Sequence, residues 1–256
     1  MHVVITGASS GIGAALAREL GKDASDSLTL IARRKDAMEA LAREVAAKCW
    51  VRPHDLSDEA RATEWIAEAE QRNGPIDVMI NNAGVENTGL ARSADPDDAV
   101  RLLRINVMSP MLIARALLPS MTARRSGTIV NVASVAAFAP MPLMAWYGAS
   151  KAALATFSEV LRAEVAREGV HVLTVYPGPI KTPMSQSAYE AYGGRKGVAG
   201  LIPMGSPETL ARLVRRAIER REPRVVYPAF YELGRRMPLL ARWLGERLNV
   251  GMRSAG

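Results

Sequence analysis

Apolar residues along this chain fall into short, nearly continuous runs that alternate with longer stretches of helical periodicity. The runs are rich in Val, Ile and Leu and predict strands at residues 2–6, 27–32, 49–52, 76–80, 127–134, 170–177 and 224–228. Apolar positions at helical spacing predict helices at residues 11–21, 35–48, 58–72, 96–123, 146–168 and 206–221. Because the strands rarely alternate with polar residues, we expect helices to cover both faces of the sheet.

This alternation of strands and helices sets the expected fold class. Parallel strands joined by helices form right-handed βαβ units, so the chain is predicted to be α/β, with a doubly wound parallel sheet of about seven strands. One domain is expected over residues 1–234, followed by a basic amphipathic extension over residues 235–256. Residues 183–205 show no clear period, and a loop of that length in a compact domain is typically a functional lid or a disordered segment.

Composition narrows the class of protein further. The 256 residues are 48% hydrophobic, which is enough for a full core. The net charge of +7 favours anionic ligands, but the basic residues are spread out and no nucleic-acid module is visible, so no nucleic-acid partner is predicted. A single cysteine, Cys49, excludes an internal disulfide and fits a reducing, cytoplasmic setting. We expect no secretory signal and no apolar run long enough to span a bilayer.

A glycine-rich stretch, "TGASSGIG", lies between the first predicted strand and the first predicted helix. Glycines let the backbone turn tightly and approach a ligand, and a helix N-terminus suits a pyrophosphate. The alternative is a turn with a purely structural role. The cofactor-binding residues predicted in this loop are Gly7, Ser9, Ser10, Gly11, Ile12 and Gly13.

The end of the second strand indicates which dinucleotide the chain would prefer. An NAD-selective domain usually carries an acidic residue there, on the ribose hydroxyls. Here Ala32 takes that place and is followed by Arg33 and Arg34, and a guanidinium can bind a 2′-phosphate. The sequence therefore predicts NADP(H), with Arg33 as the nearer contact and Arg34 able to exchange roles with it. The alternative is that both arginines begin a solvated helix face.

Further cofactor contacts are predicted after the third and fourth strands. Asp55 is placed to accept a hydrogen bond from the adenine amino group, with Leu56 beside it. The stretch "NNAG" (81–84) adds Asn82, Ala83 and Gly84, the glycine permitting close backbone approach. The amide of Asn81 either ties neighbouring strand ends together or binds the cofactor.

The motifs "TGASSGIG", "NNAG", "NVAS", "YGASK" and "PGPIKT", in this order and spacing, resemble those of the short-chain dehydrogenase/reductase family over residues 1 to about 228. The resemblance implies a Rossmann-type sheet, a nicotinamide cofactor, and hydride transfer between an alcohol and a carbonyl. It also implies the catalytic residues Asn106, Ser134, Tyr147 and Lys151 and further cofactor contacts at Pro177, Gly178, Ile180 and Thr182. Taken one at a time, each of the four catalytic candidates is equally compatible with a packing, capping or solvated role.

The spacing of Tyr147 and Lys151 places both on one helix face, one turn apart. Tyr147 is predicted to deliver the proton and Ser134 to orient the substrate oxygen, while Asn106 would hold a water on the proton path. Lys151, which would also bond the nicotinamide ribose, and a cationic nicotinamide are expected to lower the Tyr147 pKa. A shift of about 3 units, roughly 4 kcal/mol, requires a partly desolvated cleft.

The substrate is expected to be apolar, lipid-like or steroid-like. Between Ser134 and Tyr147 lies the apolar stretch "VAAFAPMPLMAW". Residues after Thr182 add an adaptable apolar wall made of Met184, Tyr189, Tyr192, Leu201, Ile202 and Met204. The alternative is that these residues only close the core.

Three hypotheses about function follow. The first is an NADP(H)-dependent carbonyl reductase or alcohol dehydrogenase that forms a dimer or tetramer. The second is an NADP(H)-sensing binding protein without turnover, and the third is a reductase of 3-oxoacyl thioesters. The basic extension is predicted to pack on the protein or a neighbouring subunit, with peripheral contact to an anionic membrane as the alternative. The three histidines share no ligand spacing, so no metal site is predicted.

Overall fold

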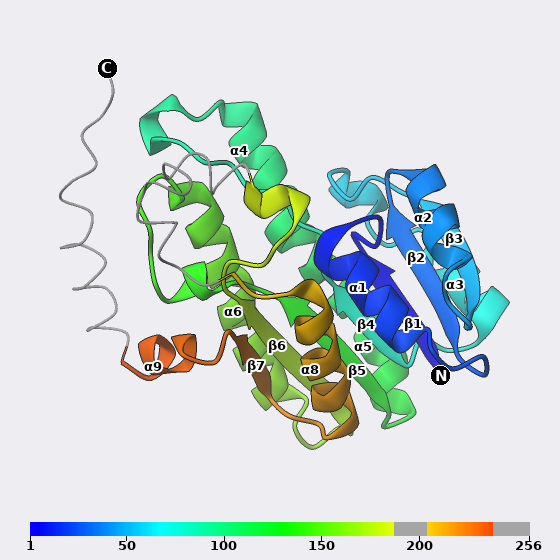
Figure 1. The fold of residues 1–256 in the computed structure, drawn as a ribbon. Helices are drawn as coiled ribbons and strands as arrows, with labels where there is room; N and C mark the ends of the chain where they lie inside the picture. The colour runs from blue at the N-terminus through cyan, green and yellow to red at the C-terminus, as the bar shows by residue number, and fades with distance from the viewer. Residues whose placement is uncertain (187–203, 238–256) are drawn as a thin grey trace.

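A parallel sheet of seven strands, in the order β3-β2-β1-β4-β5-β6-β7, forms the centre of this computed structural model, which describes residues 1–186 and 204–237 (Figure 1). The strands are β1 (His2–Thr6), β2 (Ser27–Ala32), β3 (Lys48–Pro53), β4 (Val78–Asn81), β5 (Gly127–Val132), β6 (Val170–Pro177) and β7 (Arg224–Tyr227). The strand order reverses between β1 and β4, which makes the sheet doubly wound. The predicted Rossmann-type α/β class is confirmed.

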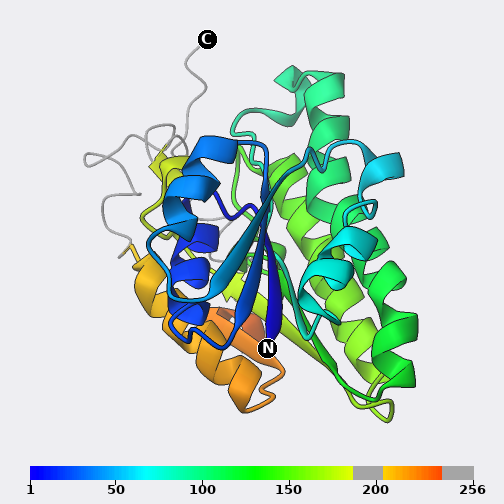
Figure 2. The same ribbon diagram turned by 90° about the vertical axis from the view of Figure 1, so that its right-hand side faces the viewer.

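Helices cover both faces of this sheet, as Figure 2 shows with the sheet between two helical layers. One layer contains α1 (Gly11–Leu20), α2 (Lys35–Ala42) and α8 (Pro207–Glu219). The other contains α3 (Ile66–Asn73), α5 (Ser109–Ala123) and α6 (Ala145–Glu164). Two shorter helices, α4 (Pro96–Leu103) and α9 (Tyr231–Arg236), lie outside these layers.

The alternation of side chains along each strand divides the core between these layers. In β1, Val3 and Ile5 pack into the cluster that includes α1 and α8, whereas Val4 packs into the cluster that includes α3 and α5. All three side chains are fully buried. Continuous apolar runs are therefore required here, because successive residues face opposite layers and neither layer faces water.

The helix predicted over residues 96–123 is interrupted by a π-helical turn, η3 (Arg104–Met108). Pro110 lies four residues after Asn106 and has no N–H, so the regular helical bond to the Asn106 carbonyl cannot form. Turns of this kind occur mostly as single bulges, often at functional sites. The interruption places Asn106 at the irregular turn, with its side chain fully buried.

Several helices are shorter than the sequence predicted. The helix expected over residues 35–48 ends at Ala42, and the one expected over residues 58–72 is preceded by a 3₁₀ turn and begins at Ile66. The helix expected over residues 146–168 ends at Glu164, so Gly169 is not its C-cap. Gly169 instead takes φ +80° in the turn before β6.

The stretch Pro96–Ala123 is long and apolar enough, by length and composition alone, to pass as a membrane span. This differs from the sequence-based expectation that no such run exists. The α5 part contributes Ile113, Leu117 and Met121 to the core against the sheet. A core helix of this kind meets the same criteria, so the finding is weak support for a membrane span.

Candidate active site

A cavity of about 780 Å³ lies at the carboxyl ends of the strands, where the strand order reverses. Among the predicted site residues, those that line it are Gly7, Ser9, Ser10, Gly11, Ile12, Arg33, Arg34, Asp55, Leu56, Asn82, Ala83, Gly84, Ser134, Tyr147, Lys151, Pro177, Gly178, Ile180 and Thr182. Two predicted residues, Gly13 and Asn106, are not part of the lining and lie behind it. The chain thus brings residues from seven separate motifs to one opening.

The glycine-rich loop has a backbone that only glycine accommodates at key positions. Gly7 has φ +67° and Gly11 has φ +56°. A Cβ on Gly13 would lie 2.3 Å from the Gly7 carbonyl oxygen, so Gly13 allows α1 to pack directly against the loop. Ser10, the N-cap of α1, makes no side-chain capping bond, and the first turn of α1 has no acidic residue. The helix N-terminus is therefore open to an anionic group.

The two arginines after β2 have different environments. Arg34 donates to the Ser9 hydroxyl from Nε at 3.2 Å and from Nη2 at 3.0 Å, and to the Ser10 hydroxyl from Nη2 at 2.7 Å. Arg33 is exposed at the cavity and makes no hydrogen bond with any residue in the described ranges. Ala32 places no carboxylate beside them. Arg34 thus organises the loop, while Arg33 is available to a ligand.

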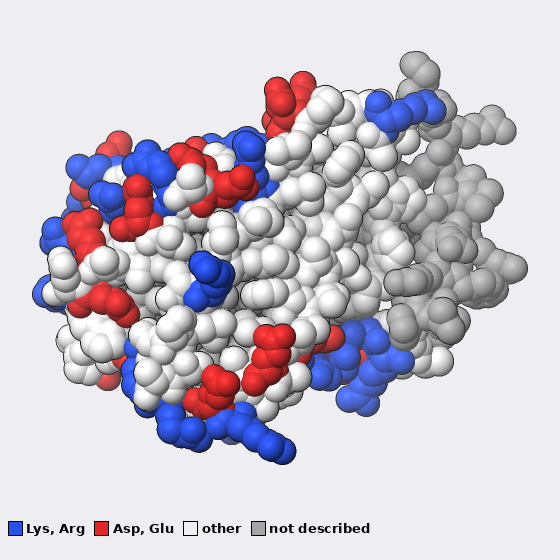
Figure 3. Space-filling model, turned by 180° about the vertical axis from the view of Figure 1, so that it is seen from behind, with Lys and Arg blue, Asp and Glu red and all other residues white. Residues whose placement is uncertain are grey.

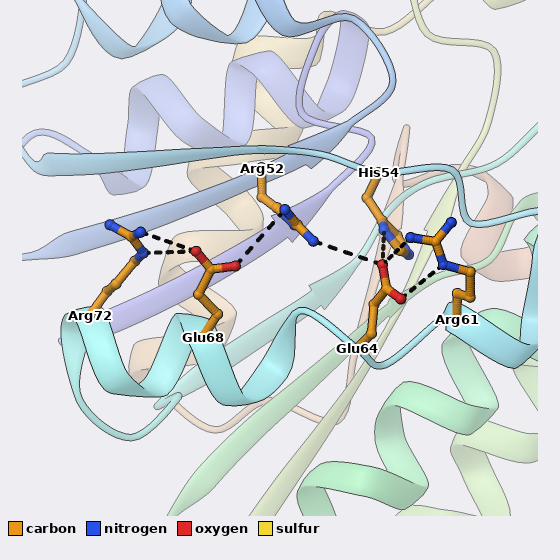
Figure 4. Close-up of polar contacts among 6 residues, drawn as sticks. All are labelled: Arg52, His54, Arg61, Glu64, Glu68 and Arg72. Atoms are coloured by element: carbon orange, nitrogen blue, oxygen red, sulfur yellow. Dashed lines mark hydrogen bonds and ion pairs between the residues drawn. The ribbon is translucent and has the colours of Figure 1, made fainter.

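A network of charged side chains holds β3, at the edge of the sheet, next to the end of the cavity that contains Arg33 and Arg34 (Figure 4). Glu64 accepts from Arg61 at 2.7 Å and lies 3.6 Å from His54 Nδ1, while Arg52 lies between Glu64 and Glu68. Burial lowers the pKa of His54, which keeps its ring neutral near pH 7. The network fixes the strand end that leads into Asp55, whose Oδ1 accepts from the Ser57 amide at 2.9 Å.

Polar side chains hold the "NNAG" segment against the glycine-rich loop. The Thr6 hydroxyl accepts from the Asn82 and Ala83 amides at 3.1 Å each, and Asn82 Nδ2 donates to the Thr6 carbonyl at 2.9 Å. Asn81 Nδ2 donates to Asn131 Oδ1 at 2.8 Å, which ties β4 to β5. Of the two roles considered for Asn81, tying strand ends together or binding the cofactor, the structure shows the first. A Cβ on Gly84 would lie 3.2 Å from Asn106 Oδ1 and 3.3 Å from Lys151 Nζ, so a side chain there would crowd both groups.

Ser134, Tyr147 and Lys151 meet at the other end of the cavity. Ser134 Oγ accepts from the Ala136 amide at 3.1 Å and donates to the Pro177 carbonyl at 3.4 Å. Lys151 is 4% exposed, and its Nζ donates to the Val132 carbonyl at 2.9 Å and lies 5.8 Å from the centre of the Tyr147 ring. The one-turn spacing expected from the sequence thus places both groups of "YGASK" at the cavity.

The predicted lowering of the Tyr147 pKa concerns the site with a cationic nicotinamide bound and stays a prediction. In the protein by itself the pKa shifts in the opposite direction. Burial raises the pKa of Tyr147 to about 12, although a hydrogen bond with Ser134 acts in the opposite direction. Burial likewise lowers the pKa of Lys151 to about 8. Desolvation is the main cause at Tyr147, and the nearby Glu86 carboxyl adds to it, while the Lys151 ammonium is directed to the Val132 carbonyl.

Asn106 supports this arrangement from behind the lining. Its Oδ1 accepts from the Val85 amide at 2.9 Å, and its Nδ2 donates to the Val85 carbonyl at 2.9 Å and to the Ser150 hydroxyl at 3.0 Å. Ser150 in turn donates to the Tyr147 carbonyl at 2.7 Å. These bonds use both N–H groups of the Asn106 amide and one lone pair of its oxygen, so the side chain holds the loop after β4 against α6.

The apolar wall is present in part where it was predicted. From the stretch between Ser134 and Tyr147 the cavity is lined by Val135, Ala136, Ala139, Met141 and Met144. Met184 and Met204 also line it. Four further predicted wall residues lie outside the described residues: Tyr189, Tyr192, Leu201 and Ile202.

Among the lining residues that the sequence analysis did not predict, Tyr231 and Glu86 bear on the chemistry of the site. Tyr231, from α9, packs so closely on Gly178 that a Cβ there would lie 2.6 Å from its ring. No local pattern marks it, since only the fold brings α9 to the cavity. Glu86 lies two residues after "NNAG", and burial raises its pKa to about 7. Its acidic side chain directly after a cofactor motif was the available signal.

Comparison with known proteins identifies the family. Residues 1–193 match the family profile described as short chain dehydrogenase. The chain belongs to the short-chain dehydrogenase/reductase family. It is 33% identical to the dehydrogenase/reductase SDR family protein 7-like of Anopheles gambiae, over 96% of this chain and 84% of that protein.

Other members of the family extend the comparison. A fatty acyl-CoA reductase of Mycobacterium tuberculosis is 36% identical over 75% of this chain and 67% of its own. For three more relatives the chain spans 63%, 60% and 62% of their length. Among solved structures, a short-chain dehydrogenase from Sphingobium yanoikuyae in complex with NADPH matches with a TM-score of 0.79 and 27% identity, covering 100% of this chain and 97% of that one.

Proposed function

We propose that this oxidoreductase transfers a hydride between NADP(H) and a carbonyl or secondary alcohol of an apolar substrate, in the direction of reduction. The observation that carries the proposal is the meeting of Ser134, Tyr147 and Lys151 in the same cavity as the glycine-rich loop. Singly, each of these residues fits a structural role. Together they supply an acid, an orienting hydroxyl and a cation next to an anion-binding helix N-terminus.

The cavity fits a dinucleotide phosphate along its length. The open N-terminus of α1 would hold the pyrophosphate, and Arg33 would bind a 2′-phosphate beside Ala32, where the end of β2 carries no acidic residue. Lys151 would bond the ribose hydroxyls beside Gly84, whose missing side chain leaves room there. When bound, the nicotinamide donates or accepts the hydride. A relative solved with NADPH supports this choice of cofactor.

Side chains of the protein would supply the proton that the substrate oxygen takes up during reduction. The Tyr147 phenol donates its proton to the substrate oxygen, and the Ser134 hydroxyl orients that oxygen by a hydrogen bond. Since the pKa of Tyr147 is about 12 in the protein by itself, the phenol keeps its proton at neutral pH. Reduction therefore starts from the protonated acid it needs, whereas oxidation would first require the phenolate.

The test is consumption of NADPH in the presence of a panel of apolar ketones and aldehydes, compared between the wild type and Tyr147→Phe. We expect the variant to lose about 10²–10⁴-fold in turnover, the usual contribution of a general acid, with cofactor affinity retained in a fluorescence titration. Equal turnover in both proteins would show that the acid is misassigned. Cofactor binding without turnover of any carbonyl would favour the NADP(H)-sensing protein instead.

A thioester reductase is the second candidate enzyme. It is favoured by the similarity to a fatty acyl-CoA reductase, and the methionine-lined wall suits an acyl chain. Including a 3-oxoacyl thioester and a simple ketone of equal chain length in the same assay separates the two candidates. A strong preference for the 3-oxoacyl thioester over the simple ketone would favour this second candidate.

A further inference from the structure

Glu86 presents a carboxyl group to an otherwise apolar part of the cavity. The side chain is half-buried, and its Oε1 is fully buried without a hydrogen-bond partner among the described residues. Neighbouring lining comes from Val85, Ala136, Met141 and Met144. A buried polar group without a partner is costly, and such a group in a binding cavity calls for an explanation. Burial raises the pKa of this carboxyl to about 7.

The backbone next to Glu86 is held rigidly. Both the amide and the carbonyl of Val85 are bonded to the Asn106 side chain at 2.9 Å. Asn106 is bonded through Ser150 to the backbone of Tyr147. The peptide that precedes Glu86 is thus held in place relative to Tyr147, which limits how far the carboxyl group can move toward water.

None of the described charged and titratable groups around the cavity is hydrogen-bonded to Glu86 Oε1. Arg33, Arg34, His54 and Asp55 line the part of the cavity next to β2 and β3. On the side of Glu86, Lys151 donates to the Val132 carbonyl. Burial raises the pKa values of Tyr147 and Tyr231, and the nearby Glu86 carboxyl adds to the rise at Tyr147, so both phenols are neutral near pH 7. Within residues 1–186 and 204–237 no side chain is thus bonded to this oxygen, which leaves it available to a ligand.

We propose that Glu86 determines specificity by accepting a hydrogen bond from a hydroxyl group next to the reacting carbonyl, so that the preferred substrate is an apolar hydroxyketone. This inference rests on the proposed function. A hydroxyl suits the site because the carboxyl can accept its hydrogen bond in either protonation state. In the reaction the carbonyl takes a hydride from NADPH and a proton from Tyr147 to give a diol, and the hydroxyl held by Glu86 is not oxidised.

The first test compares benzoin with deoxybenzoin, two bulky ketones that differ by the neighbouring hydroxyl group. The wild type should reduce benzoin with a kcat/KM about 10–100-fold higher, the range for one good polar contact. Glu86→Met should bring this ratio close to one, because it removes the contact that only benzoin makes. Glu86→Gln keeps an acceptor oxygen and should retain part of the preference. Absence of the preference in the wild type, or its persistence in Glu86→Met, would overturn the proposal.

The second test needs no turnover. Because Glu86→Met removes an unpartnered buried group, its thermal unfolding midpoint should rise above that of the wild type. Benzoin added to the NADP⁺-saturated protein should raise the midpoint of the wild type more than that of the variant. Glu168→Met, an exposed change outside the cavity, is the matched control and should match the wild type in both measurements.

These outcomes separate the inference from the proposed function. A lower midpoint in Glu86→Met would show that the carboxyl has a structural partner and would overturn the inference. Reduction of both ketones with equal efficiency would leave the proposed function standing and remove the role of Glu86. Stabilisation by benzoin through Glu86 without any NADPH consumption would support the contact and contradict the enzyme.

Discussion

At the scale of single residues, the site depends on which polar groups are already satisfied and which are left for a ligand. Arg34 is bonded to Ser9 and Ser10, whereas Arg33 has no such bonds. Lys151 donates to a backbone carbonyl, whereas Glu86 Oε1 has no hydrogen-bond partner in the part of the chain that the structure describes. The hydrogen bonds of Arg34 thus distinguish it from its neighbour Arg33, although both residues are arginines.

This difference predicts distinct effects of the two arginines on cofactor binding. Arg33→Ala should weaken NADPH binding by about 10-fold or more while leaving NADH binding unchanged, because it removes only a phosphate contact. Arg34→Ala should weaken both cofactors, since it also loosens Ser9 and Ser10. Fluorescence titrations of both variants with both cofactors measure this. Equal NADPH and NADH affinity in the wild type would contradict the assigned NADP(H) preference.

Glu86 should also leave a trace in the pH dependence of stability. Its pKa rises from an ordinary 4.5 to about 7 on folding, so the folded protein keeps a proton that the unfolded chain releases in this range. Its contribution to stability is present below pH 4.5 and is lost as the pH rises through 7. The gain in unfolding free energy in Glu86→Gln should therefore be larger at about pH 8 than at about pH 5, by roughly 1–3 kcal/mol. Denaturant unfolding at both values tests this, and a gain that does not change with pH contradicts the raised pKa.

At the scale of elements, the π turn η3 couples two segments that are distant in sequence. Pro110 removes a helical donor, and the irregular turn lets Asn106 bond both polar groups of the Val85 peptide. The same side chain reaches Ser150 on α6. One helix irregularity therefore fixes the loop after β4 relative to the helix that carries Tyr147.

Substitution of Asn106 should reveal this coupling. Asn106→Ala leaves the Val85 amide and carbonyl without these partners and should cost about 2–4 kcal/mol of unfolding free energy. Ser150→Ala, the control, breaks only one of the bonds to Asn106 and should cost about 1 kcal/mol. Denaturant unfolding of both variants gives the comparison. Equal and small losses would show that the loop after β4 does not depend on Asn106.

At the scale of the whole molecule, the two layers of helices present different surfaces. Figure 3 shows the side covered by α5 and α6, where charged side chains are sparse across the middle. Exposed apolar residues from α4, η3 and α6 include Val100, Met108 and Val160, the last 52% exposed. An uncharged face with exposed apolar side chains is typical of an interaction surface.

The predicted dimer or tetramer is therefore expected to form through this face. The wild type should sediment as a multiple of its 27.6 kDa chain, and Val160→Glu should shift it toward the monomer because a charge would be buried in the interface. Arg212→Glu, exposed on α8 in the opposite layer, should leave the assembly unchanged. A monomeric wild type in analytical ultracentrifugation would contradict the prediction.

The basic extension over residues 235–256 stays a prediction as well. Only Arg235, Arg236 and Met237 of it lie in the described part of the chain, and Arg235 and Arg236 are both bonded to Glu232. These two charges are thus already paired within α9. The alternatives for the remaining residues, packing or membrane contact, differ in whether liposomes bind the full chain.

The sequence by itself determined the strands, the glycine-rich loop and the order of motifs along the chain. These features are local: a strand covered on both faces must be apolar throughout, and a positive φ at Gly7 and Gly11 requires glycine wherever the rest of the chain lies. The strands β1 and β2 were accordingly predicted to the residue. Helix ends were less well predicted, because tertiary packing decides where a helical pattern stops.

The tertiary structure alone decided the chemical environment of the site. The raised pKa of Tyr147, the missing partner of Glu86 and the arrival of Tyr231 from α9 all depend on which distant residues exclude water from the cavity. Desolvation and pairing are set by the summed surroundings of a group, and these come from segments far apart in the sequence. Spacing along the chain could place Tyr147 beside Lys151, but it could not give the sign of the shift.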